Sequence, residues 1–162
     1  MSPTPLPNPQ DIREMLEMLL GREVSIATGA DMPSLNAEGG QVVGVFETDP
    51  YRKLAALWVS DLPISAAIGA AIGLLPASVA VEAAELGLTT ALGDNVREAI
   101  NVAGSMLNAE GAPHILLKDV YLPGERLPTD VATLVSSYVP RHNLKVTVAN
   151  GYGEGVLSIA VR

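Results

Sequence analysis

The sequence contains no cysteine among its 162 residues. This absence excludes disulfide bonds, thiolate zinc sites, iron–sulfur clusters and a cysteine nucleophile. Because a chain without disulfides fits a reducing compartment, we expect a cytoplasmic protein.

Basic and aromatic residues are also scarce. Ten lysines and arginines stand against 18 acidic residues, which gives a formal net charge of -8. Since nucleic acids and anionic membranes repel such a chain, neither is expected as a partner. With one phenylalanine, one tryptophan and four tyrosines, the core must be built mainly from Ala, Val, Ile and Leu. The length is that of one domain with a substantial core.

The N-terminal stretch MSPTPLPNPQD lacks the basic start and the apolar segment of a signal peptide. Its prolines predict a flexible arm over residues 1–9. We expect a single domain to follow over residues 10–162.

Charge is missing from one long stretch, residues 62–81 (LPISAAIGAAIGLLPASVAV). Its length matches a membrane span, and small residues recur at every fourth position from Ser65 to Gly73. However, six of its residues are alanine, and Pro63 and Pro76 leave room for about three helical turns between them. We therefore interpret the stretch as a buried, close-packed helix, and no membrane span is predicted.

The apolar pattern along the chain predicts helices interspersed with strand pairs. The first helix begins after Asn8, which can cap it, has Pro9 at its first position and ends at Gly21. Further strands are predicted near 23–27, 41–47, 53–60, 114–122, 144–149 and 155–162, further helices near 63–75 and 129–138, and a helical or irregular segment at 77–88. This order indicates an α+β fold in which a mostly antiparallel sheet packs against helices.

Two features that suggest a ligand site are better explained structurally. The glycine-rich NGYGEG at 150–155 lacks the lysine of a phosphate loop and does not open a helix, so Asn-Gly predicts a hairpin turn. The two histidines, His114 and His142, have neither the spacing of a zinc site nor a nucleophile motif beside them. We interpret them as surface or capping residues and predict no metal site.

The segment GDNVREAINVAGSMLN at 93–108 predicts a helix with an unusual outer face, beginning at about Thr90 or Gly93 and ending at Asn108. At about 100° per residue, the core face consists of Val96, Ile100, Ala103 and Leu107. The polar stripe opposite to it consists of Asp94, Glu98, Asn101 and Ser105.

Two residues distinguish this stripe from an ordinary solvated helix face. Asn101 is a mediocre helix former, and Gly104 costs about 1 kcal/mol relative to alanine. We expect Gly104 to leave the backbone open to close approach by a partner. The three-residue spacing places Glu98 beside Asn101 on the surface.

The spacing of Asp94, Glu98 and Asn101 resembles the signature of the CheC/CheX/FliY phosphatases, which dephosphorylate the chemotaxis response regulator CheY. Pro123 falls one residue short of the proline position in that signature. The order of predicted elements agrees with the family from about residue 10 to 161. The N-terminal helix has Glu17 where a second motif would have asparagine, so the single motif resembles the CheX branch.

The resemblance implies a mechanism and partners. Asn101 would orient the water that attacks the aspartyl phosphate of a CheY-like receiver domain, and Glu98 would pair with the active-site lysine of that receiver. Asp94, Gly104 and Ser105 would support the contact. The protein would need no cofactor of its own, because Mg²⁺ is expected on the receiver, and it would form a homodimer.

Two other functions stay open at this stage. The chain can be a non-catalytic, dimeric adaptor in two-component or chemotaxis signalling, because a fold can outlast an activity. It can also be a sensor that binds a small molecule beneath the helix at 63–75.

Overall fold

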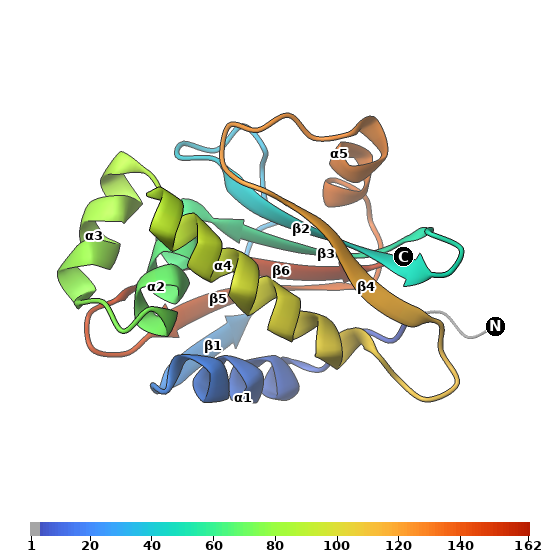
Figure 1. The fold of residues 1–162 in the computed structure, drawn as a ribbon, viewed down its shortest axis with the longest axis horizontal. Helices are drawn as coiled ribbons and strands as arrows, with labels where there is room; N and C mark the ends of the chain where they lie inside the picture. The colour runs from blue at the N-terminus through green and yellow to red at the C-terminus, as the bar shows by residue number, and fades with distance from the viewer. Residues whose placement is uncertain (1–3) are drawn as a thin grey trace.

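The computed structural model describes residues 4–162, which form a six-stranded antiparallel sheet with helices on both faces (Figure 1). The strand order is β1-β5-β6-β3-β2-β4. The strands are β1 Val24–Thr28, β2 Gln41–Asp49, β3 Leu54–Asp61, β4 His114–Tyr121, β5 Arg141–Val148 and β6 Gly153–Val161. The helices are α1 Pro9–Leu20, α2 Leu62–Ile72, α3 Ala77–Leu86, α4 Thr90–Ala103, α5 Thr129–Val135 and the 3-10 helix η1 Gly104–Leu107. The predicted α+β fold is confirmed.

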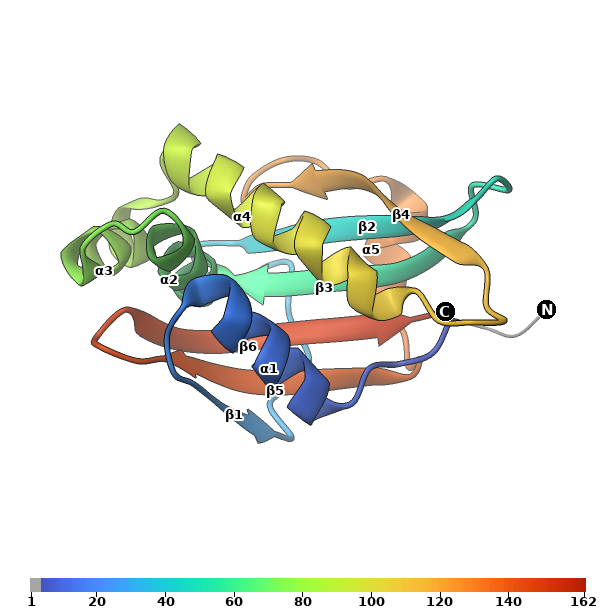
Figure 2. The ribbon, with the colours of Figure 1, turned by 60° about the horizontal axis from the view of Figure 1, so that its bottom comes forward.

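The sheet separates two hydrophobic clusters. Helices α1, α2 and α4 cover one face, and α5 lies on the other (Figures 1 and 2). On the first face, Trp58 and Phe46 are the largest fully buried side chains. On the second face, Val43 and Val45 of β2 belong to the cluster that contains Val135 of α5. Strand β2 therefore buries side chains on both faces, which explains its nearly continuous apolar sequence.

Helix α1 follows its local signals. The Asn8 side chain accepts a hydrogen bond from Asp11 N at 2.8 Å, and Gly21 ends the helix with a φ of 64°. Ile12 and Leu16 are fully buried against the sheet. The predicted start and end of this helix are confirmed.

The segment before α1 also contacts the domain. Residues 1–3 of the predicted Pro-rich arm lie outside the described residues. Thr4 is buried, and Leu6 packs against the main core cluster. The later part of the predicted arm thus lies against the fold.

Small residues in α2 allow α4 to approach closely. A Cβ atom at Gly69 would lie 2.9 Å from the backbone oxygen of Leu92, and Asn95 Nδ2 donates to Gly69 O at 2.9 Å. Nine residues of α2 are buried, whereas α3 buries Ala80 and Ala83. The interpretation of this stretch as a close-packed helix is confirmed for α2. Within residues 4–162, no helix has both the length and the apolar character that crossing a membrane requires.

The turn between β5 and β6 is the predicted hairpin. Asn150 and Gly151 have φ values of 67° and 79°. Positive φ at both central positions matches a type I′ turn, for which Asn-Gly is a preferred sequence.

Asp61 joins three elements at one end of the sheet. Its Oδ1 accepts a hydrogen bond from Ile64 N at 3.1 Å and caps α2, while Oδ2 accepts one from Val156 N of β6 at 2.9 Å. A Cβ atom at Gly155 would overlap the Asp61 carboxylate, so this position requires glycine. Burial raises the pKa of the Asp61 carboxyl above its ordinary value, and the two backbone hydrogen bonds offset this rise only in part.

This raised pKa predicts a pH-dependent stability. The folded state holds the Asp61 proton more tightly than the unfolded state, so the resulting stabilisation is present below about pH 4 and is lost as the pH rises through the folded pKa. Between about pH 4 and pH 7, the free energy of unfolding of wild type should therefore fall relative to that of Asp61→Asn. Urea unfolding across this range measures the difference, with the exposed Asp31→Asn as a control. A difference that is constant with pH would contradict the prediction.

Candidate functional site

Helix α4 is held firmly on the sheet by its inner face. Thr89 Oγ1 caps it by accepting a hydrogen bond from Leu92 N at 3.2 Å. Val96 and Ile100 are fully buried, and a Cβ atom at Gly44 of β2 would lie 2.6 Å from Ile100 Cγ2. The helix therefore touches the strand backbone at this point, which leaves it little freedom to roll or shift. The predicted core face is confirmed, including Leu107 beyond the end of α4.

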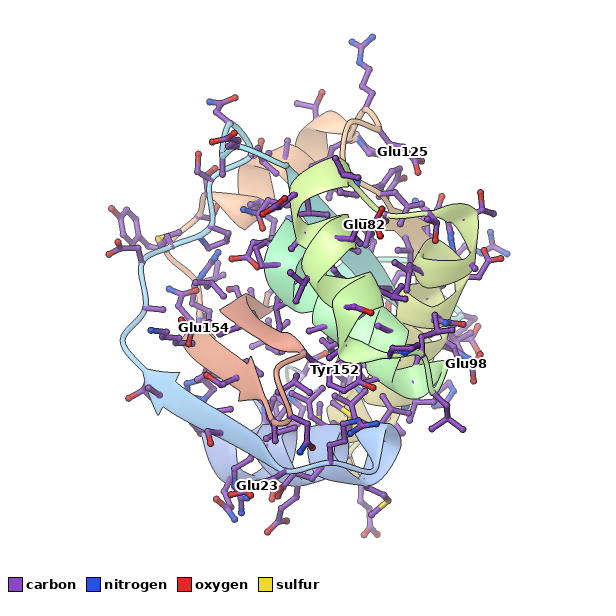
Figure 3. The ribbon with its side chains drawn as sticks, turned by 90° about the vertical axis from the view of Figure 1, so that its left-hand side faces the viewer. Glu23, Glu82, Glu98, Glu125, Tyr152 and Glu154 are labelled. Carbon is purple, nitrogen blue, oxygen red and sulfur yellow. The ribbon has the colours of Figure 1, made fainter. Side chains whose placement is uncertain are left out.

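The opposite face of α4 presents the predicted polar stripe to solvent. Asp94, Glu98 and Asn101 are all exposed. Figure 3 shows Glu98 on the outer side of the molecule, directed away from the core. Within residues 4–162, no hydrogen bond or ion pair engages the side chain of any of these three residues. Their polar groups are therefore free to bind another molecule.

The C-terminal end of the stripe differs from the prediction. The α-helix ends at Ala103, and residues 104–107 form η1. Gly104 is buried, and a Cβ atom there would lie 3.0 Å from Phe46 Cε1. The expectation that Gly104 opens the backbone to a partner is wrong, because the glycine makes room for Phe46. Ser105 is exposed, and its hydroxyl donates to Val102 O at 2.8 Å.

A shallow groove of about 320 Å³ runs between α4 and β4 beside the stripe. Its α4 wall consists of Asp94, Arg97, Glu98 and Asn101, and its β4 wall of Leu117, Lys118, Asp119 and Val120. The structure thus brings three of the predicted site residues to one groove. Ser105 does not line it and faces a different one.

Arg97, Lys118 and Asp119 are site residues that the sequence reasoning missed. Val45 of β2 pairs with Asp119 and the next residue, Phe46, pairs with Leu117, so Lys118 is the extra residue of a bulge in β4. A bulge of this kind redirects side chains and is common next to functional sites. Lys118 Nζ lies 3.8 Å from Glu47 Oε2. The positive charge of Arg97 lies beside the stripe with no ion pair among the described residues.

The groove offers polar groups that can position a bound molecule. It contains no histidine, serine, threonine or cysteine that could act as a nucleophile. No group of three or more potential metal ligands occurs within residues 4–162. An amide that can orient a water and a carboxylate that can bind a cation are available on the surface. These groups suit a reaction whose metal and reacting bond are brought by another molecule.

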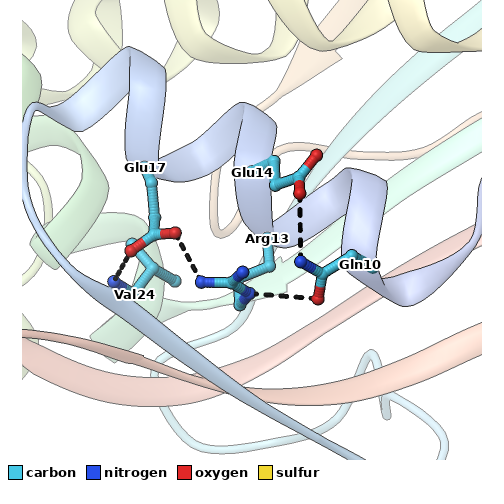
Figure 4. Close-up of polar contacts among 5 residues, drawn as sticks. All are labelled: Gln10, Arg13, Glu14, Glu17 and Val24. Atoms are coloured by element: carbon cyan, nitrogen blue, oxygen red, sulfur yellow. Dashed lines mark hydrogen bonds and ion pairs between the residues drawn. The ribbon is translucent and has the colours of Figure 1, made fainter.

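Helix α1, which would carry a second motif, uses the corresponding residues in structural contacts (Figure 4). Glu17 forms an ion pair with Arg13 and accepts a hydrogen bond from Val24 N at 3.1 Å, which ties α1 to β1. Glu14 accepts a hydrogen bond from Gln10 Nε2 at 3.0 Å. A single site, on α4, is therefore the candidate.

The proline of the motif lies away from this groove. Leu122 approaches the first turns of α4, where a Cβ atom at Gly93 would lie 3.1 Å from Leu122 Cδ1. Pro123 lies against Gly40, at 3.0 Å from the position of a Cβ atom there. This proline therefore shapes the loop after β4 and does not line the groove.

Comparison with solved structures shows which fold this is. FliM of H. pylori, solved in complex with SpeE, aligns with a TM-score of 0.57 at 9% identity, over 94% of this chain and 80% of that chain. FliY of Thermotoga maritima aligns with a TM-score of 0.53 at 20% identity, over 92% of this chain and 81% of that chain. CheX of Borrelia burgdorferi, solved with CheY, BeF3 and magnesium, aligns with a TM-score of 0.46 at 16% identity, over 92% of this chain and 91% of that chain.

The chain therefore has the fold of FliY and of the FliM middle domain. No protein-family model matches the sequence, and no curated protein does.

Proposed function

We propose that this protein, a domain with the fold of FliY and the FliM middle domain, is a phosphatase for the aspartyl phosphate of a CheY-like receiver domain. The observation that carries the proposal is the pairing of Glu98 with Asn101. Both are exposed and have no side-chain partner among residues 4–162, on a helix whose inner face is locked to the sheet. The spacing of the pair is that of the CheC/CheX/FliY signature, and FliY shares the fold.

The reaction is hydrolysis of the acyl phosphate. Water attacks phosphorus in line with the aspartyl oxygen, the P–O bond to the receiver's aspartate breaks, and inorganic phosphate and a free carboxylate result. The receiver brings its own Mg²⁺ and lysine to neutralise charge on the phosphoryl oxygens. What it needs is a group that holds the water in line. The Asn101 amide supplies that position, and Glu98 binds the receiver's lysine and so fixes the helix over the phosphate.

The groove carries charges of both signs, with the carboxylates of Asp94, Glu98 and Asp119 beside two basic side chains. Arg97 and Lys118 place positive charge beside Asn101 on a chain whose net charge is -8. They would attract the phosphoryl group and the acidic residues around it. Asp94, one turn before Glu98, would balance a cation at the edge of the contact.

A second function is favoured by a specific finding. FliM, with the same fold, has been solved in complexes with SpeE and with FliG, so this fold serves as a protein-binding module there. The rival proposal is therefore a non-catalytic adaptor. The grooves between α4 and β4 and between α1 and α4 both lie away from the place beneath α2 where a small-molecule sensor would bind its ligand. A homodimer and a cytoplasmic location remain part of the main proposal.

The test uses receiver domains from the same genome, phosphorylated with acetyl phosphate. After removal of the phosphodonor, the release of inorganic phosphate is followed with and without this protein. We expect decay of at least one receiver to become about 100-fold faster at saturation, the scale of a well-positioned reacting group. Binding without faster decay would favour the adaptor. If no receiver binds, the phosphatase proposal fails, and the adaptor would have to bind another class of protein.

A further inference from the structure

A second groove, of about 540 Å³, lies between α1 and the C-terminal part of α4 with η1. Its floor and walls are apolar and are formed by Met15, Met18, Leu19, Val102 and Met106. Asp11, Glu14 and Ser105 stand at its margin. Figure 2 shows α1 and the end of α4 running over the same face of the sheet.

The groove exposes apolar side chains to water, which is energetically unfavourable. Met18 is 86% exposed and Val102 is 37% exposed. Contiguous exposed apolar residues with a polar margin are typical of an interaction site. Methionine is unbranched and polarisable, and therefore adapts to the shape of an incoming side chain.

The acidic residues at the margin of the groove favour a partner with positive charge at the matching position. Asp11 and Glu14 form no ion pair among the described residues, and the nearby Arg13 is paired with Glu17. A partner that places an apolar side chain in the groove is therefore favoured when a lysine or arginine flanks that side chain.

The groove is continuous with the candidate site. Ser105 belongs to both the polar stripe and the groove margin, and Val102 directly follows Asn101. From Asn101 to Met106 the chain rises by about 9 Å along α4 and η1. A standard protein contact covers about 800 Å² per partner, a patch about 30 Å across. A contact of this size centred on Asn101 is wide enough to reach this groove.

We propose that the groove between α1 and α4 is a second contact for the same receiver domain, and that it decides which receiver is accepted. The occupant is an apolar side chain flanked by a lysine or arginine on the receiver surface near its phosphorylated aspartate. This inference rests on the proposed phosphatase function. It assigns the groove to substrate selection, while Glu98 and Asn101 serve the reaction itself.

The test separates selection from chemistry. With the receiver that wild type dephosphorylates best, Met18→Glu should raise KM about tenfold and change kcat less than twofold. Glu14→Lys should raise KM and flatten its dependence on salt between 50 and 200 mM NaCl, because a screened attraction is removed (Debye lengths of roughly 14 to 7 Å). Leu86→Glu, at a similarly exposed position on α3, is the matched control and should leave KM unchanged.

Each alternative result is decisive. An unchanged KM in Met18→Glu overturns the groove proposal while the phosphatase function stands. If Met18→Glu dissociates a dimer and leaves KM unchanged, the groove is a contact between copies of this chain, and the proposal is again overturned. If wild type accelerates no decay, the proposed function fails. Binding of beryllofluoride-loaded receivers then tests the groove separately: binding that Met18→Glu weakens supports it, and equal or absent binding overturns it.

Discussion

Replacement of Asn101 by alanine is expected to slow the hydrolysis of a phosphorylated receiver by about 100-fold, because a water that is no longer held in line loses its positional advantage. The side chain is exposed and has no partner among the described residues, so its removal should leave the fold intact. Binding of the receiver should change by less than about twofold, because a group that acts on the attacking water in the transition state lowers kcat without strengthening ground-state binding. Single-turnover release of inorganic phosphate measures the chemical step, and titration with a beryllofluoride-loaded receiver measures binding.

Glu98→Ala provides the complementary result. Loss of the carboxylate that we propose pairs with the receiver's lysine should weaken binding and lower kcat together, because the proposed ion pair would fix the helix over the phosphate. Asn36→Ala and Glu110→Ala, both at exposed positions outside α4, are the matched controls. If Asn101→Ala and wild type release phosphate at the same accelerated rate, the asparagine has no catalytic role and another residue of the groove must position the water.

Ile100→Ala should produce the largest loss of stability, about 2–5 kcal/mol in the free energy of unfolding. Ile100 of α4 is fully buried against Gly44 of β2, and its methyl groups occupy the space above this glycine. Removing them leaves a cavity that the sheet cannot close, because the strand backbone is held by pairing on both sides. Urea unfolding measures the loss.

The neighbouring Val102→Ala serves as the control. Val102 is 37% exposed, and its truncation should cost well under half as much as that of Ile100. A loss below about 1 kcal/mol in Ile100→Ala would show that α4 is not locked to the sheet at this point. Where Ile100→Ala remains folded, we also expect a lower phosphatase kcat, since Asn101 follows directly in sequence.

Local signals account for what the sequence predicted correctly. Asn8 and Gly21 bound α1 through contacts within a few residues, and Asn150-Gly151 forms a hairpin turn from its own backbone preferences. The buried and exposed faces of α4 follow from helical periodicity alone. The polar stripe could therefore be placed without knowledge of the remaining fold.

The missed features depend on contacts between residues far apart in sequence. The α-helix gives way to η1 at Gly104, where the backbone packs against Phe46 of β2. Lys118 and Asp119 join the groove because β4 pairs with β2 and carries a bulge. The apolar groove arises where α1 meets α4, and neither helix alone signals it. The sequence pattern of a single helix or strand does not predict contacts of this kind.

The strand order also governs when this protein becomes functional during its synthesis. Val24 of β1 pairs with Val148 of β5, and β6 lies between β5 and β3. Ribosomes add about 5–20 residues per second. Strand β5 is therefore synthesised several seconds or more after β1, and until then β1 has no strand to pair with. Such long-range pairing slows folding and leaves the apolar side of α1 exposed in the meantime. Although α4 is complete by residue 103, the sheet beneath it is finished only when β6 pairs with β3 and β5, so chains truncated before β6 should lack the activity proposed for α4.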